Sequence, residues 1–538
     1  MKRIKINIVL LVIGIIMISS CKKDYLTRPP LTGITTDNFY KSGSDLRLAT
    51  ATLYAQPWAT WNNFPLLGIG DIMSGNMLQP YNGDLVQLTT FSITPQNGTL
   101  TSAWQSFFNV IAHCNINIKA INTKMPDSVA VKSKTGALGE IRFIRATSYL
   151  YLAQLWGAVP IIEDNDKLIA NPLVPRHKLE DVYKFIINDL RYAVANLPRT
   201  DQPGRVTMWS AQGMLAKVYL SRAGLNQKGS RNQSDLDSAA YYAGNVCKSS
   251  GLSLLPSYYN LFRTQYNDNS ESLFAYQWAP GVPYGQGNSI QAQFAPSGSI
   301  VTGGGGWGGA IGPTIDLANQ YTTQDSVRRK ATFMLTGDKY RELNAAGGGY
   351  TATGVNVKKH IVGTAADNNS PTMDLWSSIE HNAVLRLADV YLIYAEALLG
   401  NNASTTNADA LLYFNQVRSR AGVDIVTVLT PDIIRKERRI ELAFEGQYWF
   451  DLVRLSYYDP QEAIKILHLQ TTPTDNPDPN KRYIPRSQFS YDPATGIKTA
   501  SNNSLIITPP SANTFTLPIP ANEQTADPKL LEAPVPYY

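Results

Sequence analysis

The chain has 538 residues, of which 43% are hydrophobic, 10% aromatic and only 17% charged. Disordered chains carry few aromatic residues and many charges, so this composition excludes a disordered protein, and it also excludes a collagen-like or multi-span membrane protein. The net charge of +6 falls to +3 without Lys2, Arg3 and Lys5, which leaves 45 basic against 42 acidic residues. The charge therefore gives no reason to expect a nucleic acid as partner, because nucleic-acid-binding proteins usually carry a clustered basic patch.

The beginning of the chain predicts export. Lys2, Arg3 and Lys5 precede an apolar stretch at residues 6–18, which is shorter than the roughly 20 residues that span a bilayer. Two serines then lead to Cys21. This arrangement resembles the lipobox of bacterial lipoproteins, in which the cysteine is acylated and becomes the mature N-terminus. We expect residues 1–20 to be a signal peptide and Cys21 the lipid attachment site; the alternatives are an ordinary signal peptide with an incidental cysteine, or a short anchor.

The body of the chain predicts a mainly α-helical fold. Paired stretches with small residues at their crossings are similar to tetratricopeptide units, although the 34-residue period is not clean. Thr430 is a plausible N-cap with Pro431 in the first turn, and the sequence after residue 455 predicts an irregular, Pro-rich tail. Apolar residues recur at helical spacing at 136–156, 178–197, 210–223, 236–247, 383–399, 408–420 and 430–442.

Two long segments interrupt the helical pattern. Residues 279–313 are rich in Gly, Pro, Ser and Gln, and residues 340–371 in Gly and Asn. Long irregular segments inside a globular chain are usually functional or disordered. Aromatic residues and Ile are scattered through both segments, so we do not interpret them as linkers. They predict a loop-rich portion built onto the helical scaffold.

Catalytic and metal-binding patterns are nearly absent. The five histidines are not paired at ligand spacing, and the sequence has no H-E-x-x-H, C-x-x-C or G-x-S-x-G motif. Gly303, Gly305 and Gly308 match a dinucleotide fingerprint formally, but no strand precedes them. We therefore predict no catalytic residue, no metal and no cofactor. A pair of glycosidase carboxylates far apart along the chain stays open.

A charged helix near the C-terminus has a structural interpretation. Glu437 falls on a partly apolar stripe of the predicted helix 430–442, and a carboxylate in such a place needs a partner. Arg418 and Arg420, on the preceding predicted helix, are the candidates. We expect a structural ion pair between two helices rather than a catalytic acid. Cys114 and Cys247 are expected to be small hydrophobic residues rather than a disulfide.

Several distinctive motifs occur along the whole chain. They are CKKDYL from Cys21, LWGAVP at 155–160 and LPIP at 517–520, together with the segments 205–224, 304–321, 386–399, 415–422 and 437–455. In combination they resemble the SusD/RagB family of outer-membrane nutrient-uptake lipoproteins of Bacteroidetes. CKKDYL is similar to the acylated N-terminus of that family, LWGAVP to the end of a family helix, and LPIP to a motif near the family's C-terminus. The final residues APVPYY depart from the common ending NPGY.

The resemblance implies a fold, a location and a role. It implies a scaffold of tetratricopeptide-like helix pairs in a lipoprotein on the outer face of the outer membrane. It also implies that the protein captures a glycan, or in some members a peptide, and caps a SusC-like TonB-dependent transporter barrel. The expected division is a signal peptide at 1–20, an N-terminal region at 21–255 and a C-terminal region at 256–538, packed as one body. A surface glycoside hydrolase and an adhesin are the remaining alternatives.

Aromatic residues in loops are the expected ligand contacts. Sugar rings present apolar C–H faces that stack on aromatic side chains, and binding residues favour loops on a rigid scaffold. Trp307 and Tyr81 are the strongest candidates, because neighbouring glycines and Asn82 leave their faces open. Local packing of the loop is the alternative role for each loop aromatic. The other predicted contacts are Trp61, Tyr284 and Trp278, with Trp58 and Trp376 as further loop aromatics.

Overall fold

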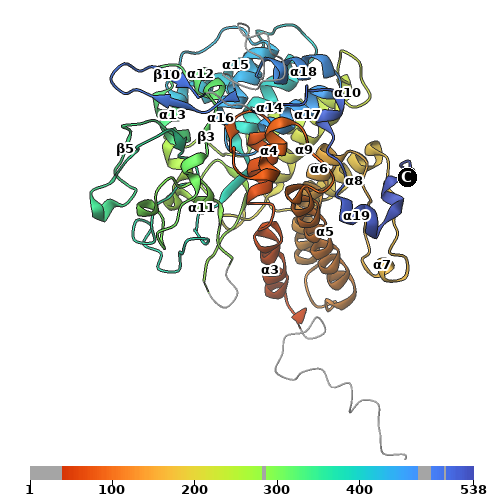
Figure 1. Cartoon of the computed structure of the whole chain (residues 1–538). Helices are drawn as coiled ribbons and strands as arrows, with labels where there is room; N and C mark the ends of the chain where they lie inside the picture. The colour runs from red at the N-terminus through yellow and green to blue at the C-terminus, as the bar shows by residue number, and fades with distance from the viewer. Residues whose placement is uncertain (1–38, 282–285, 471–485, 502–504) are drawn as a thin grey trace, which may run out of the picture.

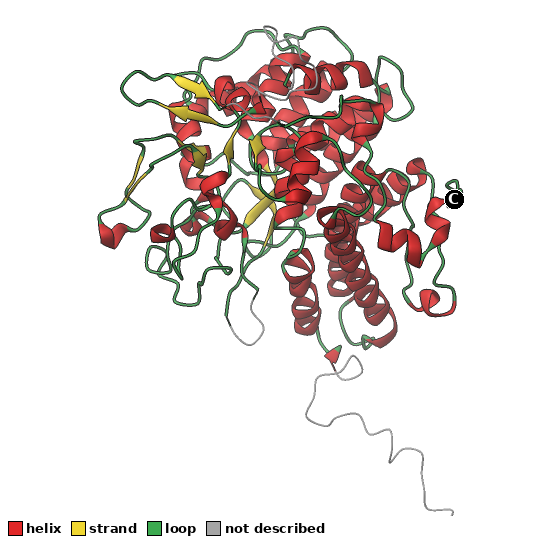
Figure 2. Cartoon of the chain, in the orientation of Figure 1, coloured by secondary structure: helices red, strands yellow, loops and turns green. Residues whose placement is uncertain are grey.

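The computed structural model describes residues 39–281, 286–470, 486–501 and 505–538. The predicted signal peptide and Cys21 lie outside the described residues. Helices form most of the structure, and a few short strands lie on one side (Figures 1 and 2). The α-helices are α3 (Gly43–Ala51), α4 (Gly83–Thr90), α5 (Gly98–Lys124), α6 (Val131–Trp156), α7 (Asp166–Ala170), α8 (Leu179–Asn196), α9 (Met208–Arg222), α10 (Gln233–Ser249), α11 (Ile290–Phe294), α12 (Ile315–Gln320), α13 (Ser326–Thr332), α14 (Leu387–Leu399), α15 (Ala408–Ala421), α16 (Pro431–Glu441), α17 (Tyr448–Ser456), α18 (Pro460–Leu469) and α19 (Ala521–Ala526).

The long helices pack as successive neighbours. Helix α5 packs on α6, α6 on α8, α8 on α9, α9 on α10, α10 on α14 and α14 on α15. This series confirms the predicted mainly α-helical scaffold of tetratricopeptide-like helix pairs. Thr430 caps α16 as predicted, since its hydroxyl accepts a hydrogen bond from the backbone N–H of Ile433 at 3.3 Å. None of the described helices has the length and apolar character that crossing a bilayer requires.

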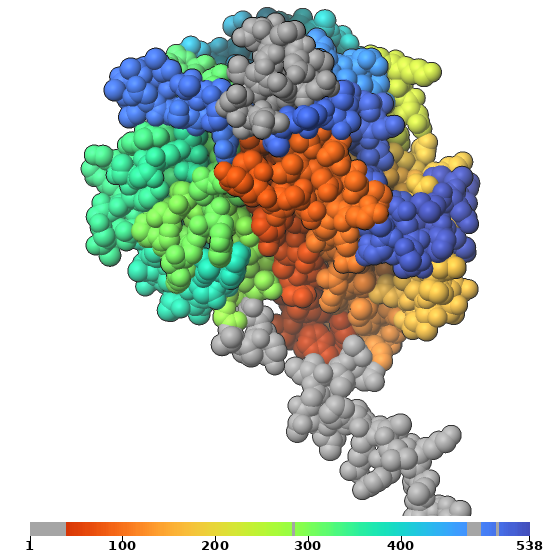
Figure 3. Space-filling view, in the orientation of Figure 1, coloured from red at the N-terminus to blue at the C-terminus, as the bar shows by residue number. Residues whose placement is uncertain are grey.

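Within the described residues, the strands form five antiparallel two-stranded ladders, and two of these, β1–β3 and β2–β8, join segments far apart in the sequence. Figure 3 shows the result on one face, where the orange N-terminal segment lies directly beside the green loop-rich segment. The pairs are β1 (Met77–Leu78) with β3 (Gly312–Pro313), β2 (Ser272–Tyr276) with β8 (Asn382–Arg386), β4 (Phe333–Met334) with β7 (Asn356–Val357), β5 (Lys339–Tyr340) with β6 (Tyr350–Thr351), and β9 (Phe489–Tyr491) with β10 (Lys498–Ala500).

Aromatic side chains fill the centre of the core. Trp58 and Trp61 lie against Phe107 of α5 and Tyr151 of α6, and the rings of Phe107 and Tyr151 stack with centroids 5.1 Å apart. The short segment that follows α3 and carries Trp58 and Trp61 is therefore anchored on α5 and α6.

The two cysteines of the described residues do not form a disulfide. Cys114 is buried and free, and Cys247 is half-buried and free.

Some parts of the fold differ from the sequence-based expectation. The expected helix at 383–399 starts later, because residues up to Arg386 form strand β8 against β2. The expected irregular tail contains helix α18, which Asp459 caps by accepting from the backbone N–H of Glu462 at 3.0 Å. Helix α5 was not predicted, because its many Thr, Asn, Val and Ile residues have low helix propensity. Its apolar face, packed on α6, stabilises it instead.

Candidate functional site

The β1–β3 ladder brings two predicted ligand contacts to one end of the same structural element. Met77 lies opposite Pro313 and Leu78 opposite Gly312. Tyr81 follows β1 and Trp307 precedes β3, so in an antiparallel pair both leave the ladder at the same end. A hydrogen bond of 3.0 Å from the Thr314 N–H to the Asn76 carbonyl closes the opposite end.

Trp307 is stacked on a second exposed indole. The ring centroids of Trp307 and Trp376 are 4.7 Å apart, and the ring planes differ by 15°. Trp307 is 52% exposed, Trp376 46% and Tyr81 80%, although aromatic rings of this size dominate protein cores. We call Tyr81, Trp307 and Trp376 the aromatic platform. It presents flat apolar surface to solvent with polar N–H and O–H groups at the ring edges.

Close backbone packing explains the glycines around Trp307. A Cβ atom on Gly308 would lie 1.8 Å from the carbonyl oxygen of Phe294, and one on Gly306 would lie 2.8 Å from that of Ala295. The Trp307 N–H donates to the Ala292 carbonyl at 3.1 Å. Only glycine permits this approach of the segment to α11. The backbone of Trp307 is thus held in place while its ring stays in solvent.

A polar hollow lies next to Tyr81 of the platform, because the following residue, Asn82, lines it. Its volume is about 540 Å³, which is within the range of small-molecule sites. Asn63, Asn82, Asp84 and Gln286 line it together with Phe64. The buried side-chain oxygen of Asn63 has no hydrogen-bond partner within the described chain. The hollow therefore offers amide and carboxylate groups to a ligand rich in hydroxyls.

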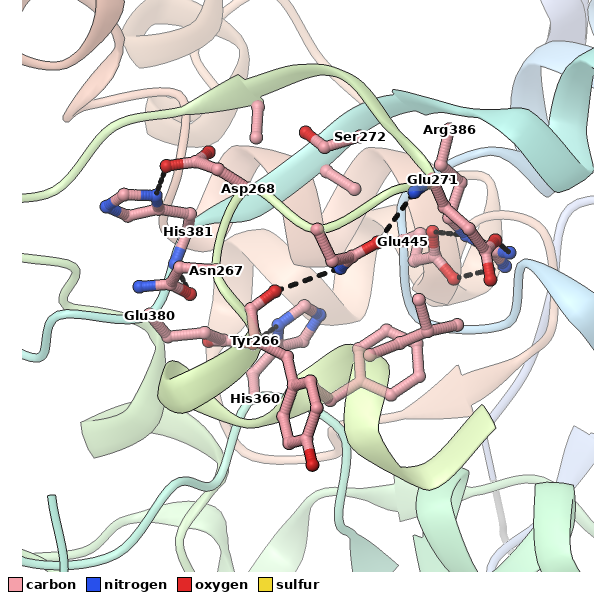
Figure 4. Close-up of a pocket in the computed structure, with 15 residues that line it drawn as sticks. Tyr266, Asn267, Asp268, Glu271, Ser272, His360, Glu380, His381, Arg386 and Glu445 are labelled. Carbon is pink, nitrogen blue, oxygen red and sulfur yellow. Dashed lines mark hydrogen bonds and ion pairs between the residues drawn. The ribbon is translucent and has the colours of Figure 1, made fainter. Parts of the chain in front are cut away.

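A second cavity, shown in Figure 4, is too small for a sugar ring. It measures about 30 Å³, which suffices for one or two water molecules. Ion pairs line it, with His360 Nδ1 2.9 Å from Glu380 Oε1 and His381 Nδ1 3.1 Å from Asp268 Oδ2. Burial lowers the pKa of His360, but the Glu380 carboxylate and the hydrogen bond to the Phe444 carbonyl together raise it, so the net direction is upward. This cavity belongs to the interior rather than to a ligand site.

A buried ion cluster lies against this cavity. Arg328 contacts Glu437 at 2.6 Å and Glu441 at 2.9 Å, and Arg386 contacts Glu441 at 2.6 Å. Burial raises the pKa of Glu441, but the arginines that surround it outweigh burial and hold this pKa well below its ordinary value. We call Arg328, Arg386, Arg420, Glu271, Glu437, Glu441 and Glu445 the buried ion cluster. Each of these side chains has an ionic partner, which is typical of a structural role.

Comparison with known proteins places the chain in a family. Residues 327–538 match the model described as the SusD family, and residues 44–220 match one described as "Starch-binding associating with outer membrane". A SusD-like protein of Bacteroides ovatus is 36% identical over 534 residues, which cover 97% of this chain and 96% of that protein. The chain belongs to the SusD family. SusD-family proteins are non-catalytic, so the chain is a binding protein and not an enzyme.

Solved structures agree with this assignment to the SusD family. A crystal structure with a xylogluco-oligosaccharide is 36% identical, has a TM-score of 0.83, and is matched over 92% of this chain and 99% of its own. A laminarin-binding SusD-like protein has a TM-score of 0.68 at 22% identity, and it is matched over 93% of this chain and all of its own. The second match shows the SusD fold alone.

The structure places the predicted ligand contacts in different environments. Tyr81 and Trp307 are exposed at the same end of the β1–β3 ladder, whereas Tyr284 lies outside the described residues. Trp61 and Trp278 require correction. Trp61 is fully buried against Phe107 and Tyr151, and Trp278 is 2% exposed, with its ring N–H donating to Asn382 at 3.1 Å. Neither ring has a free face for a ligand.

Of the two arginines predicted to pair with Glu437, the structure places only one in contact with it. Arg418 contacts Glu437 at 2.6 Å. The expectation for Arg420 is corrected, because its guanidinium contacts Glu271 at 2.6 Å and Glu441 instead. Arg328, which sequence reasoning missed, provides the second partner of Glu437. No local sequence signal pointed to Arg328, because it lies on the short helix α13, between the two predicted loop-rich segments.

Sequence reasoning ranked Trp376 too low among the loop aromatics and missed the polar hollow. Leu375 gives the physical link, because its side chain lies 2.8 Å from the position of a Cβ atom on Gly305. The glycine-rich segment and the segment carrying Trp376 therefore pack on each other. Adjacent Leu and Trp in a loop, together with a glycine-rich segment elsewhere, are the signal that could have suggested this contact.

Proposed function

We propose that this chain captures an oligosaccharide on the aromatic platform and delivers it to a partner TonB-dependent transporter in the outer membrane. The observation that carries the proposal is the stacked and solvent-exposed pair of Trp307 and Trp376. Leaving two indoles in water has a free-energy cost, and a flat apolar ligand face removes that cost by covering them.

The chemistry of the surroundings favours a sugar over a purely apolar ligand. The polar hollow next to Tyr81 carries Asn63, Asn82, Asp84 and Gln286, whose oxygen and nitrogen atoms can fix hydroxyl groups. Support also comes from the 36% identical structure with a xylogluco-oligosaccharide. A β-linked neutral oligosaccharide is the ligand class that we propose.

The membrane attachment and the transporter are the finer parts of the proposal. The match to the family described as associating with the outer membrane supports the location. The lipobox-like sequence before Cys21 supports a lipid anchor, with the folded body on the outer face of the membrane. The resemblance to nutrient-uptake lipoproteins supports a TonB-dependent barrel as partner.

The test is binding of the purified full-length chain to xyloglucan by affinity electrophoresis. The double variant Trp307→Ala/Trp376→Ala is expected to weaken binding by about tenfold or more, because two stacking surfaces are lost. Tyr241→Ala is the matched control, since Tyr241 is 64% exposed on α10, a helix of the scaffold. Unchanged binding in the double variant, or binding of peptides but no oligosaccharide by the native chain, would contradict the proposal.

A further inference from the structure

A second hollow is lined by cations from the segment between Trp307 and Trp376. Its volume is about 520 Å³, and Lys330, Lys339 and Arg341 line it together with Tyr259 and Glu342. Lys339 and Arg341 are exposed and Lys330 is half-buried. Figure 1 shows β5 and α13, which carry these residues, on the opposite side of the molecule from helices α6 and α8. We call this site the basic hollow.

The charges of the basic hollow are not neutralised by the protein. Among the described residues, Lys330, Lys339 and Arg341 have no carboxylate within ion-pair distance, whereas neighbouring Arg329 is paired with Asp338. Glu342 is the acidic residue on the lining, and it accepts a hydrogen bond from the Tyr259 hydroxyl. Three cations on one concave surface repel one another unless an anion enters.

A further basic side chain lies beneath the surface. Lys358 is 3% exposed, and its ammonium group lies 3.8 Å from Glu342 and 5.3 Å from the centre of the Tyr259 ring. The Glu342 carboxylate therefore already has a cationic partner in the buried Lys358. The ammonium group of Lys330 lies 5.3 Å from the centre of the Tyr340 ring, so an aromatic side chain rather than an acid supports it. The net charge facing a ligand is therefore positive.

We propose that the basic hollow is a second binding site, which takes the carboxylate or sulfate groups of an acidic polysaccharide. The fit is chemical, because Lys and Arg bind such oxyanions and the Tyr259 ring offers an apolar face beside them. This inference goes beyond the proposed function and does not depend on the tryptophan pair. The chain then binds the charged groups of a polysaccharide in the basic hollow, in addition to a neutral sugar on the aromatic platform.

Position favours a polysaccharide over an anionic membrane surface. The hollow is concave, whereas a lipid surface is met by a broad exposed patch. Its loop is also tied to the platform: the Asn344 N–H donates to Asp367 at 2.9 Å, and the Ala365 N–H donates to Thr302 at 2.7 Å. Thr302 precedes the glycine segment that packs on Leu375 and carries Trp307. Both sites thus belong to the same loop-rich portion.

The test compares charge-matched variants of the full-length chain. Lys339→Ala/Arg341→Ala removes two cations of the hollow, and Lys132→Ala/Lys167→Ala removes two exposed cations elsewhere. The probes are polygalacturonate for carboxylate, dextran sulfate for sulfate, xyloglucan as neutral polymer, and phosphatidylglycerol vesicles. Neither Lys339 nor Arg341 makes a side-chain hydrogen bond or ion pair within the described chain, so we expect thermal unfolding to be unchanged.

We expect at least one anionic polymer to bind the native chain, more weakly as salt increases. Its affinity should fall by about tenfold in the hollow variant and by less than about twofold in the control. Xyloglucan binding should be equal in both variants, and Trp307→Ala/Trp376→Ala should keep the anionic binding. The inference is overturned if neither anionic polymer binds, if the control loses as much affinity, or if only the vesicles respond to the hollow variant.

Discussion

The buried ion cluster and the aromatic platform use their side chains in opposite ways. In the cluster, Arg328, Arg386 and Glu441 are almost fully buried, and each has ionic partners at 2.6 to 2.9 Å. In the platform, Trp307 and Trp376 are about half exposed, and their rings stack on each other. The first region satisfies its groups internally, which stabilises the fold, whereas the second leaves surface that a ligand can cover.

Both regions join distant parts of the chain, and this makes the contrast informative. The cluster joins α13 to α15 and α16, and the platform joins the segment after β1 to the segment before β3. Position in the fold alone therefore does not distinguish a structural site from a binding site. Exposure and the presence of internal partners do.

The largest expected effect is loss of stability from the cluster. Glu441→Gln removes the buried carboxylate that Arg328, Arg386 and Arg420 share, and we expect the free energy of unfolding to fall by about 3–5 kcal/mol. Asp432→Asn on the same helix removes an exposed ion pair with Arg435 and should cost less than about 1 kcal/mol. Chemical denaturation of both variants measures the difference, and equal losses would remove the contrast between cluster and surface.

Lowering the pH should reduce the stability of the fold through the carboxylates of the buried ion cluster, whereas the aromatic platform has no carboxylate to protonate. Burial raises the pKa of Glu441 and of Glu445, but neighbouring cations hold both below the ordinary value of 4.5. A carboxylate whose pKa is lower in the folded state than in the unfolded state stabilises the fold at any pH above its unfolded-state pKa. This stability is lost as the pH falls from that value toward the pKa of the folded state. We expect the melting temperature to drop as pH falls from about 5 to 3, by less in Glu441→Gln. An equal drop in that variant would show that other groups are responsible.

Tyr81→Ala should have the smallest effect on stability and a measurable effect on binding. The side chain is 80% exposed, so we expect the free energy of unfolding to change by less than about 0.5 kcal/mol. Loss of one aromatic surface should weaken oligosaccharide binding by about three- to tenfold. Calorimetric titration checks the affinity, and full affinity in this variant would restrict the platform to the two tryptophans.

Periodicity predicted the fold where it is regular. Helices α8 and α10 follow their apolar stripes closely, and α6 and α9, which are apolar on most faces, are buried on several sides by neighbouring helices. The same reasoning did not find α5, whose residues are poor helix formers in isolation. It also extended a helix into β8, because the pairing of that segment with β2 is not visible in local sequence.

The site was predictable only in part, because burial is a tertiary property. Trp307 and Tyr81 have glycine or asparagine neighbours, and both rings are exposed. Trp61 also lies in a segment without helical pattern, yet α5 and α6 cover it. The stacking of Trp376 on Trp307 depends on the packing of two loops, which spacing along the chain does not reveal.

A crystal structure of the chain with a xylogluco-oligosaccharide tests the central claim most directly. The account predicts sugar rings within about 4 Å of the exposed faces of Trp307 or Trp376, with hydroxyl groups directed at the polar hollow that Asn63 and Asn82 line. An oligosaccharide bound elsewhere on the molecule, with both indoles still open to solvent, would contradict it.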